Sequence, residues 1–210
     1  MNEKNFSYEI STYEKILNDD LKTFSPYFFN MKYRKKRLQI LIRYLIEEKL
    51  KITKEEALTK LNLDILKKYK LLCILKYIEK PVELEKNDLS FLVYYAYPNS
   101  NLKPPTSKEL TIEYYKKVLS KEKRSFPKNY FLDAIEGEKR AKYCVEYLVD
   151  EVLKIEKKDI PQKLTLEVIQ KYNLKILFTT IYFSMYDLIT NIYPNQFTIE
   201  DFNKKEGKKK

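Results

Sequence analysis

The chain of 210 residues contains only two glycines, Gly137 and Gly207, and it has no histidine and no tryptophan. Walker A loops and dinucleotide-binding loops need several glycines, because a side chain would keep backbone amides away from the phosphates. Without histidine, the chain offers no Ser-His or Cys-His pair to activate a nucleophile and no imidazole ligand for a metal. These absences favour a protein that is not an enzyme and binds no cofactor or metal.

Long apolar segments are also lacking. The longest uncharged run, residues 176–186, is far shorter than the roughly 20 residues that span a bilayer. The amino terminus has no apolar signal core. The two cysteines, Cys73 and Cys144, are isolated among apolar neighbours, so we expect free thiols in a reducing compartment. The sequence therefore predicts a cytoplasmic protein with no membrane partner.

Positive charge is in excess. The formal net charge is +11, and residues 204–210 form a short basic tail. A basic surface raises the expectation of nucleic acid as a partner. The alternative is that an A/T-rich genome inflates the lysine count, in which case the charge serves only solubility.

One stretch occurs twice. Residues 27–71 align without a gap to residues 130–174 at an offset of 103, and 17 of the 45 positions are identical. Further along, Tyr97-Pro98-Asn99 reappears as Tyr193-Pro194-Asn195. A period near 100 residues is the size of a domain, so the pattern indicates a duplicated domain.

Helix signals dominate both copies. Capping boxes open helices at Ser11, Thr53 and Thr106, and Ser25-Pro26 predicts the start of a long helix that ends near Leu50. Asn62 and Thr165 are predicted caps at matched positions, and Ser184 is predicted to cap the last helix of the second copy. No segment shows the alternation of a strand. We therefore predict an all-α protein of two homologous helical domains, residues 1–103 and 104–203, followed by the basic tail 204–210.

Basic clusters are the candidate nucleic-acid contacts. Cations neutralise phosphates and release counterions, and Lys36-Arg37 is identical to Lys139-Arg140 in the other copy. For each cluster a solvated helix face is the alternative, and cations near a helix end also suit the helix dipole. The predicted nucleic-acid-binding residues are Arg34, Lys35, Lys36, Arg37, Lys67, Lys68, Lys139, Arg140, Lys142, Lys171 and Lys175.

Residues 164–197 carry a recognisable pattern: Leu164-Thr165, then Lys171-Tyr172-Asn173-Leu174, Tyr186-Asp187-Leu188-Ile189 and Tyr193-Pro194-Asn195. This pattern resembles tandem helical repeats in uncharacterised Firmicutes proteins. In outline it is also similar to small helix-turn-helix repeats beside phage and homing-endonuclease modules. The resemblance implies helix-turn-helix-like units. We therefore hypothesise a protein that binds double-stranded DNA, the alternative being a helical protein-interaction module such as a phage-type inhibitor or adaptor.

Overall fold

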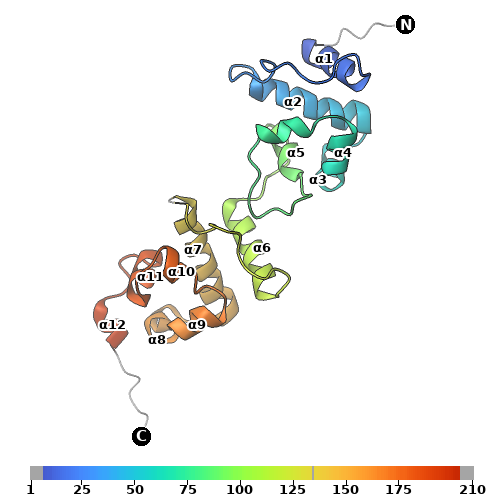
Figure 1. Cartoon of the computed structure of the whole chain (residues 1–210). Coiled ribbons are helices and arrows are strands. Elements are labelled where there is room, and N and C mark those ends of the chain that lie inside the picture. Colours follow the sequence, from blue (N-terminus) through green and yellow to red (C-terminus); the bar gives the residue numbers. More distant parts are fainter. Residues whose placement is uncertain (1–6, 134, 204–210) are drawn as a thin grey trace. The chain divides into compact units, whose positions relative to one another are not determined.

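The computed structural model describes residues 7–133 and 135–203, which are helical with no strand in these ranges (Figure 1). Contacts divide the chain into two compact units, Met1–Pro104 and Pro105–Lys210, here called the first and second units. The all-α prediction is thus confirmed. The predicted basic tail, 204–210, lies outside the described residues. None of the described helices has the length and apolar character needed to cross a membrane.

In the first unit, the central helix α2 is covered by α1 on one side and by α5 on the other (Figure 1). Its side chains Leu38, Leu41 and Ile42 are fully buried, which is the apolar stripe that the sequence predicts. The elements of this unit are α1 (Tyr8–Leu17), α2 (Arg34–Tyr44), the π-helical turn η1 (Leu45–Leu50), α3 (Lys54–Lys60), α4 (Leu63–Lys68), the 3-10 turn η2 (Leu72–Lys76) and α5 (Ser90–Ala96).

The second unit repeats this arrangement, with α7 between α6 and α11 (Figure 1). A final helix packs on α8, and the side chain of Gln162 donates to the carbonyl of Asp201 at 2.6 Å. The elements are α6 (Ser107–Leu119), α7 (Glu136–Tyr147), the π-helical turn η3 (Leu148–Leu153), the 3-10 turn η4 (Lys157–Asp159), α8 (Ile160–Lys163), α9 (Leu166–Lys171), α10 (Leu177–Thr180), α11 (Met185–Ile192) and α12 (Ile199–Asn203).

Matched residues pack alike in the two units. The rings of Tyr13 and Tyr44 meet edge to face at 6.1 Å and 75°, and those of Tyr115 and Tyr147 at 6.1 Å and 77°. The hydroxyl of Tyr13 donates to the carbonyl of Tyr69 at 2.7 Å, and that of Tyr115 to the carbonyl of Tyr172 at 2.8 Å. The duplication read from the sequence is therefore a duplication of structure.

The predicted helix from Pro26 to Leu50 is wrong at its start, because α2 begins only at Arg34. The chain before it forms turns that bury Phe28 and Phe29 and leave Tyr27 81 % exposed. The backbone amides of Phe28 and Asn30 donate to the carbonyls of Ser25 and Tyr27, three residues earlier, as in turns and not as in an α-helix.

The ungapped alignment is also wrong in this segment. In the second unit the buried pair before α7 is Tyr130 and Phe131, so the offset here is 102 and not 103. The second unit therefore has one extra residue before α7. Gly137 stands where the first unit has Arg34, and a Cβ atom on it would lie 2.5 Å from the carbonyl oxygen of Phe131. Only glycine permits this close backbone approach.

Most predicted caps are confirmed. Thr53 and Thr106 both form complete capping boxes, and the side chains of Asn62, Thr165 and Ser184 accept backbone hydrogen bonds at the starts of α4, α9 and α11. The box predicted at Ser11 is wrong, because α1 begins three residues earlier, at Tyr8.

Candidate nucleic-acid interface

Arginines at the start of α2 hold the aromatic segment before the helix. The Nε atom of Arg34 donates to the carbonyl of Phe29 at 3.0 Å, and its guanidinium lies 5.0 Å from the ring centre of Tyr77. Arg37 donates to the carbonyl of Phe28 and lies 4.8 Å from the centre of that ring. Both arginines are half-buried, so their main contacts are within the protein.

Arg140 repeats the role of Arg37 in the second unit. It donates to the carbonyl of Tyr130 at 3.1 Å and lies 4.7 Å from that ring centre. Tyr130 is the structural counterpart of Phe28 once the offset of 102 is applied. The presence of arginine in both copies therefore has a structural reason that needs no nucleic acid.

The neighbouring lysines differ between the units. Lys35 and Lys36 are exposed and make no ion pair with an acid in the described part of the chain. Lys139 pairs with Glu136 at 2.8 Å, and this hydrogen bond lowers the pKa of the Glu136 carboxyl and raises the pKa of Lys139. Lys142 lies 3.8 Å from Glu146. The predicted cations of α7 thus each have a partner within the second unit; they are Lys139, Arg140 and Lys142.

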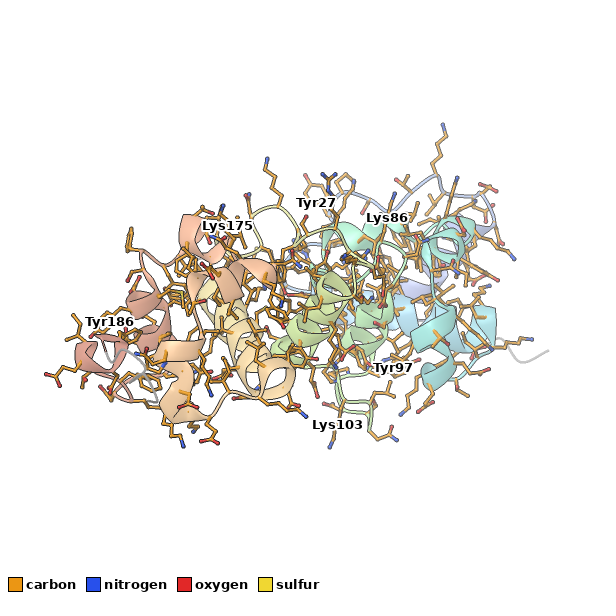
Figure 2. The ribbon with its side chains drawn as sticks, turned by 90° about the horizontal axis from the view of Figure 1, so that it is seen from below. Tyr27, Lys86, Tyr97, Lys103, Lys175 and Tyr186 are labelled. Carbon is orange, nitrogen blue, oxygen red and sulfur yellow. The ribbon has the colours of Figure 1, made fainter. Side chains whose placement is uncertain are left out.

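The second group of predicted cations lies at the ends of α4 and α9. Lys68 lies 5.5 Å from the ring centre of Tyr69, and Lys171 lies 5.7 Å from that of Tyr172. Lys67 is exposed and unpaired among the described residues. The exposed Lys175 is likewise unpaired there and lies at the periphery of its unit (Figure 2). These lysines lie on or after α4 and α9, whereas Arg34 and Lys139 lie on α2 and α7, so the predicted cations come from more than one element of each unit.

Short helix pairs are present, and the second helix of each pair carries a carboxylate in its first turn. A two-residue turn, Leu61-Asn62, joins α3 to α4, and a matching turn joins α8 to α9. In DNA-binding helix-turn-helix proteins the first residues of the second helix contact base edges. Here the first turns carry carboxylates, Asp64 in α4 and Glu167 in α9.

One matched pair of exposed lysines was not predicted as a site. Lys51 and Lys154 follow the π-helical turns η1 and η3 and adopt left-handed backbone conformations, with φ of 53° and 52°. A left-handed conformation costs a residue with a Cβ about 1–2 kcal/mol, so glycine or asparagine is usual there. The signal was visible in the sequence, since Lys51-Ile52 is identical to Lys154-Ile155. Both lysines are exposed, and neither makes an ion pair with a described residue.

Acidic and thiol groups give no metal site in the described ranges, where no group of three or more Cys, Asp or Glu side chains comes together. The thiols of Cys73 and Cys144 are free, as expected from the sequence. Cys144 is fully buried and Cys73 is partly buried, and burial raises the pKa of the Cys73 thiol.

Comparison with known proteins identifies a family. A family model described as a protein of unknown function, DUF4046, matches residues 10–100 and again residues 111–198. Each match falls within one structural unit, so the family's repeat coincides with the unit. No curated protein and no solved structure matches the chain.

Proposed function

Since the chain belongs to the DUF4046 family of proteins of unknown function, we propose from its own surface that it is a non-enzymatic DNA-binding protein of the cytoplasm. The two helical units would contact the phosphates of double-stranded DNA with little preference for sequence. The observation that carries this proposal is a set of exposed lysines that no described acid neutralises. They are Lys35, Lys36, Lys51, Lys67, Lys154 and Lys175.

Two arguments support phosphate contact over base reading. An unpaired ammonium that binds a phosphate releases a counterion, and this gain does not depend on the base sequence. The acids Asp64 and Glu167 at the starts of α4 and α9 would repel the phosphates that flank a groove. Repeated basic units along one chain also suit an extended ligand, whose charge is uniform along its length.

A titration of fluorescently labelled duplexes tests the proposal. The full chain is added to short duplexes of unrelated sequence at two salt concentrations, and anisotropy is measured. We expect similar affinities for all sequences and a slope of log affinity against log salt of about −0.9 per phosphate contact. Absence of binding at low salt would reject DNA as the partner and leave the alternative, a helical protein-interaction module.

A further inference from the structure

The second unit contains a pocket of about 400 Å³, which is lined by residues 124–132 and by Asn173, Ile176 and Thr180. Its floor includes the buried ring of Phe131, and its rim includes Leu132 and Ile176, which are 57 % and 43 % exposed. Thr180, at the end of α10, forms another wall. Exposed aliphatic side chains around a hollow are typical of a surface that binds an apolar group.

The first unit shows what fits at this position. There the ring of Tyr77 lies 4.9 Å from the ring of Phe29, with the guanidinium of Arg34 at 5.0 Å from its centre. The counterpart of the phenylalanine is Phe131, at the offset of 102, and that of the arginine is Gly137, at the offset of 103. Counting on at 103 beyond the aligned stretch places Thr180, which lines the pocket, at the position of the tyrosine. The second unit therefore keeps the phenylalanine floor and lacks both the ring and the cation that cover it in the first unit.

A third replacement puts another small side chain in the lining of the pocket. Lys70 of the first unit reaches back to α1, where its ammonium donates to the carbonyl of Ile16 at 2.9 Å and pairs with Asp19. Its counterpart is Asn173, which has the same left-handed backbone and lines the pocket with its shorter side chain. All three differences exchange a large side chain for a small one.

Charge around the pocket has one sign. Arg124 and Lys128 are among the lining residues, and no carboxylate is. Lys175 stands beside the rim residue Ile176 and lies at the periphery of the unit (Figure 2). None of these three cations makes an ion pair with a residue that the structure describes. An occupant with carboxylates next to its apolar group would complement this rim.

We propose that this pocket binds an aromatic side chain of a protein partner, presented by a segment with acidic residues on either side of it. The bound ring takes the place that Tyr77 occupies in the first unit, and the flanking carboxylates meet Arg124, Lys128 and Lys175. An unstacked nucleic-acid base fits less well. The first unit fills the equivalent position with the side chain of Tyr77 packed against Phe29, so an aromatic side chain is the occupant for which the fold itself gives a precedent.

The test uses a labelled synthetic peptide, Asp-Glu-Tyr-Glu-Asp with blocked ends, and the full chain. We expect saturable binding to the wild type and none to the same peptide with alanine in place of tyrosine. Thr180→Tyr supplies the first unit's own ring and should weaken binding at least about tenfold, the size of effect seen at interface hot spots. Thr179→Tyr, at the exposed neighbouring position, is the matched control and should bind as the wild type does.

Several results would overturn the proposal. They are no saturable binding by the wild type, equal binding of the alanine peptide, or unchanged binding by a folded Thr180→Tyr variant. If Thr180→Tyr does not fold, the double variant Arg124→Glu and Lys128→Glu decides, since both changes lie on the rim and should abolish binding of the acidic peptide. Binding of oligothymidylate, or self-association of the chain, that Thr180→Tyr abolishes would assign the pocket to another occupant. Because the proposal does not rest on DNA binding, either can fail alone.

Discussion

At the scale of single residues, the two arginines Arg37 and Arg140 show why identity between copies does not by itself indicate function. Each donates to the carbonyl of a buried aromatic residue and lies against that residue's ring. A guanidinium can do both at once, because it is planar and carries several donors, whereas lysine is a point charge. The adjacent lysines, Lys36 and Lys139, share no such contact.

Arg140→Ala should therefore lower the free energy of unfolding by about 1.5–3 kcal/mol, the usual range for a hydrogen bond to a charged group. The neighbouring change Lys139→Ala removes only an exposed ion pair and should leave the free energy of unfolding close to that of the wild type. Urea unfolding followed by circular dichroism measures both. Equal stabilities for the two variants would contradict the structural role of the arginine.

At the scale of elements, the hydrogen bonds of a helix cap distinguish a real helix start from a sequence that only has the spacing of one. Thr53 accepts from the backbone of Glu56, and the Glu56 carboxylate accepts from the backbone of Thr53 at 3.0 Å. The hydrogen bond from Lys60, and then the one from Thr53, lower the pKa of Glu56 to about 2. Ser11 and Glu14 have the same spacing, but they lie inside α1, where the backbone amide of Ser11 already donates to Ser7.

Thr53→Ala should cost about 1 kcal/mol of stability, as is typical for the loss of a capping side chain. Ser11→Ala is the matched control and should be neutral or slightly stabilising, because alanine has the higher helix propensity. Thermal unfolding of both variants decides this. The bonds that the Glu56 carboxylate accepts from Lys60 and from the backbone of residue 53 remain in Thr53→Ala, so in this variant and in the wild type their contribution to stability should be lost as pH falls from the unfolded pKa near 4.5 towards 2.

The π-helical turns are the second feature of this scale. Both end in a left-handed lysine, and π-helical turns are frequent at functional sites. Lys70, another left-handed lysine, contacts α1, whereas Lys51 and Lys154 are exposed and make no ion pair with a described residue, so under the proposed function their ammonium groups are available to phosphates.

Lys51→Gly combined with Lys154→Gly should raise stability, by about 0.5–1 kcal/mol per site if most of the left-handed cost is relieved. The same double variant should bind duplex DNA more weakly than the wild type. Denaturation and anisotropy titrations on one preparation measure both effects. A loss of stability would contradict the expected relief of the left-handed backbone, and unchanged DNA affinity would remove these lysines from the proposed interface.

At the scale of the whole molecule, the sequence predicts the duplication, the all-α class and most of the helix starts. These features depend on residues close together in the sequence, such as the capping residues Asn62 and Ser184. The one-residue shift before α7 was not predictable. The sequence aligns Tyr27-Phe28 with the identical Tyr130-Phe131, whereas the burial of the side chains makes Phe28 the counterpart of Tyr130. The hydrogen-bond and ion-pair partners of the basic residues could not be predicted from the sequence either, because they depend on tertiary contacts.

Because of its buried tyrosines, the stability of the folded chain should depend on pH in the alkaline range. Burial raises the pKa of Tyr182 to about 12, and burial likewise raises the pKa values of Tyr13, Tyr115 and Tyr193. A raised folded pKa means that the stabilisation is complete below the unfolded value of about 10 and is lost as pH rises beyond it. We expect unfolding above about pH 10, with these phenols ionising only as the chain unfolds. Absorbance at the phenolate band and circular dichroism should then change together, and full ionisation of a folded chain would contradict the burial.

The most direct test of the proposed DNA binding compares two sets of four lysines changed to glutamine in the full chain. One set is unpaired among the described residues: Lys36, Lys51, Lys154 and Lys175. The other set pairs with acids on the surface: Lys60, Lys116, Lys158 and Lys163. Both variants have the same formal charge. The proposal predicts that the first set flattens the slope of log affinity against log salt by up to about 0.9 for each phosphate that is no longer neutralised, and that the second set has a much smaller effect. Equal effects of the two sets would show that net charge alone governs binding, and would contradict an interface built on the unpaired lysines.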